Sequence, residues 1–199
     1  MPLPANELVA LLVAVSFAAG LNVYATVATL GLLGHYQLIA LPPSLHALTG
    51  WPIIVVSAVL FAVEFFADKI PAFDLVWNAL HTFIRVPVAA LLAFEATASL
   101  SPGEQLAATL AGGLIAFIAH GGKTAARAAV TPSPEALSNI ALSTGEDAFA
   151  VFLTWMATWK PYIAAALAII AVIGIMLLIR WVYRACCAVL DRLRALFTA

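Results

Sequence analysis

Residues 162–183 read YIAAALAIIAVIGIMLLIRWVY, and Arg180 is the only charged side chain among them. A helix needs about 20 predominantly apolar residues to cross the hydrocarbon core of a bilayer. Trp181 and Tyr183 close the run with the aromatic residue types that favour the membrane–water interface. This stretch therefore predicts a membrane-spanning helix.

The composition of the whole chain supports the same class of protein. Of its 199 residues, 64% are hydrophobic and 10% are charged, and the mean hydropathy is +1.06. A soluble domain carries about 25% charged residues, so this chain has too few to cover a soluble surface. The net charge of −1 favours neither nucleic acid nor an anionic lipid surface as a partner. The adjacent Cys186 and Cys187 are too few to form a structural zinc site.

Working outward from residues 162–183, breakers divide the rest of the chain into further apolar segments. We expect an all-α, polytopic membrane protein of about six transmembrane segments, with broken or re-entrant helices. The expected segments are 6–34, 51–68, 74–99, 104–130, 135–159 and 162–183. They form a single integral membrane domain over 1–199, with a first half (1–100), a second half (101–183) and a cytoplasmic amphipathic tail (184–199).

The first segment is too long for a single straight crossing. At 1.5 Å per residue, its ~29 residues would reach ~43 Å, against a core of about 30 Å. It either tilts and protrudes, or breaks at Gly20 into two half-helices. Backbone groups freed at a break must be satisfied by neighbours or by a bound ion, so Asn22 is a candidate ion-binding residue.

Six crossings would place both termini on one side of the membrane. That side would hold every Lys and Arg except Lys160, and the positive-inside rule makes it the cytoplasm. We expect the bacterial inner membrane. Three segments per half also allow a 3+3 inverted repeat, in which a break at Gly121-Gly122 would correspond to the one at Gly20.

A cluster of charged residues lies between Val63 and Arg85. Glu64 and Asp68 are four residues apart and share one helix face. A charge at membrane depth costs several kcal/mol unless it is paired or wetted, and paired carboxylates suit proton exchange or cation binding. Alternatively, Lys69 and Arg85 neutralise them, or Asp68 and Lys69 lie at the water interface. Asp74 is expected to cap the helix that leads to Arg85, and Pro87 to kink or restart that helix.

The second half offers charged counterparts. Lys123 and Arg127 have the same four-residue spacing, which suits an anionic group, although charges flanking a membrane segment are an alternative. Glu146 and Asp147 follow Gly145 and predict half of a coordination site at a broken helix, or an acid pair that bonds Lys123 or Arg127.

Two histidines are candidate proton relays. His81 lies one turn before Arg85, and His120 lies three residues before Lys123. A role as core or interface histidines is the alternative. The histidines lack the spacing of known metal motifs, so any metal is unknown, and no cofactor or catalytic residue is expected.

Four motifs resemble those of a known family. They are GLNVY from Gly20, VEFFADKIPAFD from Val63, HTFIR from His81 and TPSPEALSN from Thr131. Together they resemble a family of small bacterial membrane proteins catalogued only as a domain of unknown function, over about residues 16–159. The resemblance implies a polytopic helical protein and carries no activity or site residues.

We expect a small transporter or channel for an ion or small charged solute, in contact with membrane lipids and assembled as a homo-oligomer. Its site would combine Glu64, Asp68, Glu146, Asp147, Lys123, Arg127, Arg85 and Asn22. A membrane-embedded enzyme acting on lipid or prenyl-phosphate headgroups is one alternative. A non-catalytic assembly protein is the other.

Overall fold

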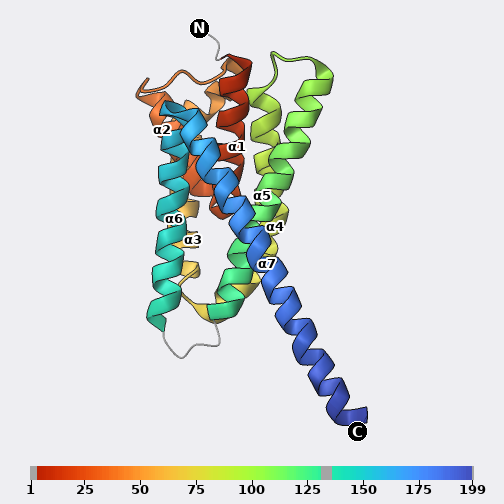
Figure 1. Cartoon of the computed structure of the whole chain (residues 1–199). Helices are drawn as coiled ribbons and strands as arrows, with labels where there is room; N and C mark the ends of the chain where they lie inside the picture. Colours follow the sequence, from red (N-terminus) through yellow and green to blue (C-terminus); the bar gives the residue numbers. More distant parts are fainter. Residues whose placement is uncertain (1–3, 131–135, 199) are drawn as a thin grey trace.

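The computed structural model describes residues 4–130 and 136–198, which form an all-α bundle (Figure 1). Its elements in chain order are α1 (Ala5–Leu21), α2 (Val23–His35), the 3-10 helix η1 (Pro43–Thr49), α3 (Trp51–Ala67), α4 (Pro71–Ala96), α5 (Pro102–Val130), α6 (Ala136–Trp159) and α7 (Pro161–Thr198). The expected breaker at Thr131–Glu135 lies outside the described residues.

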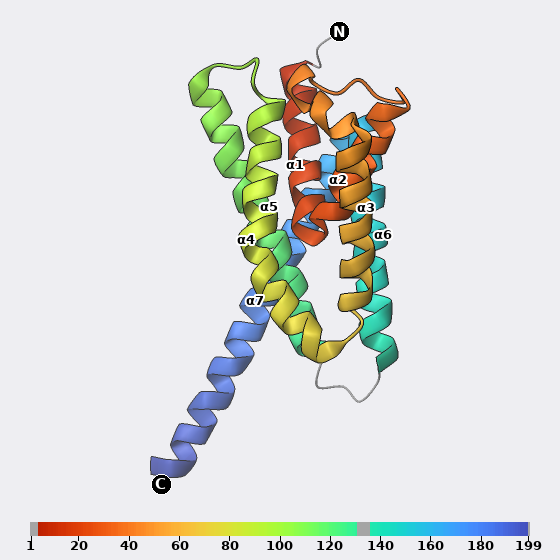
Figure 2. The same ribbon diagram turned by 180° about the vertical axis from the view of Figure 1, so that it is seen from behind.

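The first segment breaks, and it also turns back. α1 descends from one end of the bundle to near its middle, and α2 returns to the same end (Figures 1 and 2). The break falls at Asn22, whose backbone is extended (φ −151°, ψ 102°). Its side-chain Oδ1 accepts a 2.9 Å hydrogen bond from the Ala25 N–H and so caps α2. The predicted break near Gly20 is therefore confirmed, and it forms a helical hairpin.

The other helices run alternately along the bundle (Figure 2). Within the described residues, three helical stretches are long and apolar enough to cross a membrane: Trp77–Ala96, Pro102–Arg127 and Pro161–Trp181. A fourth is present if η1 and α3, which are bent by 64°, count as one span. These helices indicate a membrane location.

The start of α4 differs from the expectation. The helix begins at Pro71 with Ile70 at its N-cap position, so Asp74 does not occupy the N-cap. Proline suits a first helical turn because the missing N–H has no intrahelical partner there. The helix continues through Pro87 to Ala96, so it does not restart there, and the kink expected as the alternative stays a prediction.

Two expected glycine breaks are also wrong. α5 is continuous through Gly121-Gly122, and α6 is continuous through Gly145. An interior glycine costs a helix only about 1 kcal/mol relative to alanine, which packing against neighbours can offset. The correspondence between Gly20 and Gly121-Gly122 that suggested an inverted repeat is thus not present.

The two chain ends lie at opposite ends of the bundle (Figure 1). The expected arrangement had both on one side, because it counted residues 6–34 as a crossing. The expected tail at 184–199 is not a separate element either. It continues α7, which runs beyond the bundle as one helix to Thr198.

α1 is the centre of the hydrophobic core. From Leu8 to Leu21 only Val9 is exposed, and α1 contacts α2, α4, α5, α6 and α7. Gly20 lets it approach α5 closely, since a Cβ there would lie 2.5 Å from the Ala116 carbonyl oxygen and 2.7 Å from the Ala119 Cβ. Small residues thus serve helix packing within the chain.

Replacing Gly20 with valine is expected to destabilise the protein by about 1–3 kcal/mol, the usual cost of overpacking. The clash is with backbone, so side-chain rotation cannot relieve it. Thermal unfolding in detergent, followed by circular dichroism, measures the change. Gly121→Ala is the matched control, because a Cβ there meets nothing within 4 Å. Equal melting temperatures for Gly20→Val and wild type would contradict this account of the α1–α5 contact.

Candidate functional site

Seven charged residues from four helical segments gather beside the α1–α2 turn. We call them the charged cluster: Glu64 and Asp68 at the end of α3, Arg85 in α4, Lys123 and Arg127 in α5, and Glu146 and Asp147 in α6. Six of them are at most 3% exposed, and the side chain of Glu146 is 10% exposed. The structure therefore brings together every charged residue predicted for the site.

Glu64 and Arg85 form the ion pair nearest α4. Both side chains are fully buried, and Arg85 donates from NH2 to Glu64 Oε1. The other guanidinium nitrogen, NH1, donates to His120 Nδ1 at 2.8 Å and to Asn78 Oδ1 at 3.3 Å. Arg85 neutralises Glu64, as one of the two sequence interpretations expected.

Asp68 is fully buried, so the alternative that placed it at the water interface is wrong. Its Oδ2 accepts from Lys123 Nζ at 2.9 Å and from Arg127 NH2 at 2.8 Å. Lys123 and Arg127 beside it thus compensate its buried negative charge. Lys69 is only partly buried and donates to the Phe65 carbonyl oxygen at 2.9 Å.

Lys123 and Arg127 join the α3 acids to the α6 acid Glu146. Arg127 donates to Glu146 Oε2 from NH2 at 2.7 Å and from Nε at 3.2 Å. Lys123 Nζ lies 3.8 Å from the same oxygen and 3.5 Å from Glu64 Oε1. Both cations are thus shared between carboxylates.

The helix break connects directly to the charged cluster. Asn22 is fully buried, and its Nδ2 donates to Asp147 Oδ1 at 2.8 Å. Lys123 Nζ donates to the carbonyl oxygen of Leu21, the last residue of α1, at 3.2 Å. Protein groups on α5 and α6 therefore bind the backbone and side chain of the turn, as expected for a break inside a membrane protein.

The two candidate proton relays, His81 of α4 and His120 of α5, contact other polar groups of the bundle. His120 accepts from Arg85 at Nδ1, and its Nε2 lies 3.1 Å from the Asn78 carbonyl oxygen, so the ring is neutral with its proton on Nε2. His81 Nδ1 lies 2.7 Å from the Trp77 carbonyl oxygen, and its Nε2 lies 3.2 Å from the Tyr24 hydroxyl. Both histidines are buried, and His81 contacts α2 through the Tyr24 hydroxyl.

Sequence reasoning missed three polar residues: Asn78 and Thr82, which contact Arg85 and His120, and Ser143. Asn78 lies two helical turns before Arg85, so its position on the same α4 face was a usable signal. Thr82 Oγ1 lies 2.8 Å from His120 Nε2. Ser143 is one turn before Asp147. Among the residues that the structure describes, no group of three or more His, Cys, Asp or Glu side chains is arranged to hold a metal ion.

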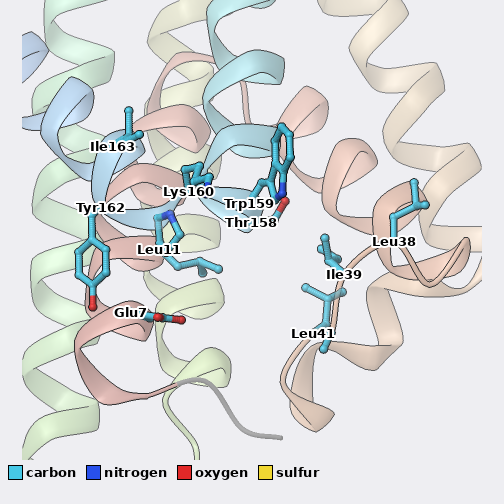
Figure 3. Close-up of a pocket in the computed structure, with 13 residues that line it drawn as sticks. Glu7, Leu11, Leu38, Ile39, Leu41, Thr158, Trp159, Lys160, Tyr162 and Ile163 are labelled. Atoms are coloured by element: carbon cyan, nitrogen blue, oxygen red, sulfur yellow. The ribbon is translucent and has the colours of Figure 1, made fainter.

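A cavity of about 640 Å³ lies at the other end of α1 (Figure 3). Glu7 and Leu11 of α1 line it, together with the loop around Ile39 and the α6–α7 turn at Lys160. Leu11 is eleven residues, or about 16 Å of helix, from Asn22. The cavity therefore contains none of the predicted site residues.

The family model described as "Domain of unknown function (DUF4126)" matches residues 9–181. The chain belongs to this family. The resemblance inferred from the motifs is thereby confirmed, and the whole charged cluster lies inside the DUF4126 match. No curated protein and no solved structure matches the chain.

Proposed function

We propose that this DUF4126 protein is a small membrane transporter or channel for an ion or small charged solute, with its binding site at the charged cluster. The supporting observation is the junction of a broken helix with seven charged residues, six of them buried, inside a bundle that has helices of membrane-spanning length. Burying ionised groups costs several kcal/mol each unless partners compensate. Intramembrane charges of this kind mark ion and substrate pathways in other proteins.

The proposed topology adapts the six expected segments to the hairpin. α3 to α7 cross the bacterial inner membrane, and α1–α2 enters and leaves as a sixth, re-entrant segment. The basic end of α7, with Arg184, Arg192 and Arg194, lies in the cytoplasm, which places the N-terminus on the opposite side. Lipid and further copies in a homo-oligomer cover the exposed apolar side chains, such as Phe83 and Leu110.

The shared ion pairs offer a way to bind a charged solute. Lys123 has three carboxylates within 4 Å, those of Glu64, Asp68 and Glu146. An incoming anion would compete with these carboxylates for Lys123. An incoming cation would compete with Lys123 for the carboxylates. An exchange of partners of this kind can occur without leaving any charge unpaired.

Flux into liposomes tests the proposal. Glu64→Gln should lower the flux of the transported ion about tenfold or more, equivalent to about 1.4 kcal/mol, because it removes the charge that Arg85 and Lys123 share. The assay screens small cations and anions one at a time. Glu95→Gln is the matched control, since it removes the charge of a glutamate in α4 that lies outside the charged cluster. Flux that survives Glu64→Gln unchanged would favour a purely structural network.

A further inference from the structure

The charged cluster holds one carboxylate more than it holds cations. Its acids are Glu64, Asp68, Glu146 and Asp147, and its bases are Arg85, Lys123 and Arg127. Every base lies within 4 Å of at least one of the first three acids. Asp147 alone among these four acids makes no such ion pair with the described residues, and its hydrogen-bond partner is the neutral amide of Asn22.

One oxygen of Asp147 has no hydrogen-bond partner among the described residues. Asp147 is 3% exposed, and its Oδ2 makes no hydrogen bond to the described part of the chain. Ser143 lies one turn earlier in α6, on the same helix face. It is fully buried, and its Oγ is likewise without a partner there. A buried polar atom without a partner is unfavourable, so the free oxygen of Asp147 indicates that this carboxyl binds something further.

We propose that Asp147 takes up and releases a proton, and that this proton is the coupling ion of the transporter. The inference rests on the proposed function. With Asp147 neutral, the cluster holds three carboxylates and three cations, so its charges balance. The added proton also neutralises a buried carboxylate that has no ion-pair partner among the described residues.

Other titratable groups act on this carboxyl from the surrounding helices. Lys123 of α5 and Lys69 after α3 favour its charged form, and Glu64 and Asp68 of α3 oppose it. The hairpin contributes only Asn22, which is neutral, and Glu146 is its neighbour in α6. Movement of Lys123 toward or away from Asp147 would therefore release or bind the proton. In this way proton exchange is tied to the same cation that a charged solute would engage.

Labelling with the apolar reagent dicyclohexylcarbodiimide, which reacts with protonated carboxyl groups in apolar surroundings, tests the proposal on the full chain in liposomes. Peptide mass spectrometry should find the adduct on Asp147, falling as pH is raised and lost in Asp147→Asn. The ion-paired Glu64 should stay unmodified. Infrared spectra should show the C=O stretch of a protonated carboxyl in wild type and its loss in Asp147→Asn.

Three outcomes separate the possibilities. Absence of both the adduct and the infrared band in folded wild-type protein would overturn the proton site. Protection of Asp147 by sodium at every pH would overturn it in favour of a metal cation. Labelling does not require transport, so an adduct without any flux would leave the proton site standing and refute the proposed function.

Discussion

Arg85→Met is expected to lower the free energy of unfolding by about 3–5 kcal/mol, the usual cost of removing one partner of a buried ion pair. Arg85 and Glu64 are both fully buried. Without the guanidinium, the ion-pair partner left to Glu64 among the described residues is Lys123, at 3.5 Å and shared with other acids. His120 and Asn78 lose a hydrogen-bond donor as well. Denaturant titration in detergent micelles measures the loss.

A double-mutant cycle isolates the pair. Glu64→Leu combined with Arg85→Met removes both charges, and we expect it to be more stable than Arg85→Met alone, since apolar replacement of a whole buried pair is often tolerated. If Arg85→Met unfolds at the same denaturant concentration as wild type, the pair does not stabilise the fold.

Lys123→Met is expected to cost a similar 3–5 kcal/mol and to abolish flux. Lys123 Nζ donates to the Leu21 carbonyl at the end of α1 and to Asp68 Oδ2. Methionine keeps the length and apolar volume of the side chain but leaves that carbonyl and part of the charge on the acids uncompensated. Unfolding in detergent and liposome flux report the two losses separately.

Lys160→Met is the matched control, because Lys160 is exposed and lies at the α6–α7 turn, outside the charged cluster. Its effect should stay within about 0.5 kcal/mol, as for most surface changes. Lys123→Met with Asp68→Asn should recover part of the stability, since it also removes one excess negative charge. Equal effects of Lys160→Met and Lys123→Met would remove the basis for giving Lys123 a special role.

The length of residues 6–34 allowed either a tilted straight helix or a break near Gly20, and the structure shows the break, at Asn22. The reversal of the chain there could not be predicted, since two half-helices can continue forward or fold back with the same sequence. The outcome depends on partners distant in the chain, such as Asp147, which binds Asn22 across 125 residues.

Burial of Glu64 followed from its position one turn inside α3, but that of Asp68 did not. Asp68 lies beyond the last residue of α3, where water is the usual neighbour, and its partners Lys123 and Arg127 are 55 and 59 residues away. Glycine was a poor guide to helix breaks because its role, too, depends on contacts with residues distant in the chain. A Cβ at Gly122 would lie 2.6 Å from the Ile175 side chain, so this glycine permits close packing within an intact helix.

The α1–α2 hairpin also brings opposite helix poles together at one point. The carbonyl end of α1 carries about half a negative charge and the amide end of α2 about half a positive one. Lys123 binds the carbonyl end of α1 through Leu21. Asp147 binds Asn22, the residue that caps the amide end of α2. Each ionised side chain thus faces the backbone pole of opposite sign. The hairpin supplies a fixed field in which Asp147 can exist without its proton, and a displacement of α2 would weaken that field.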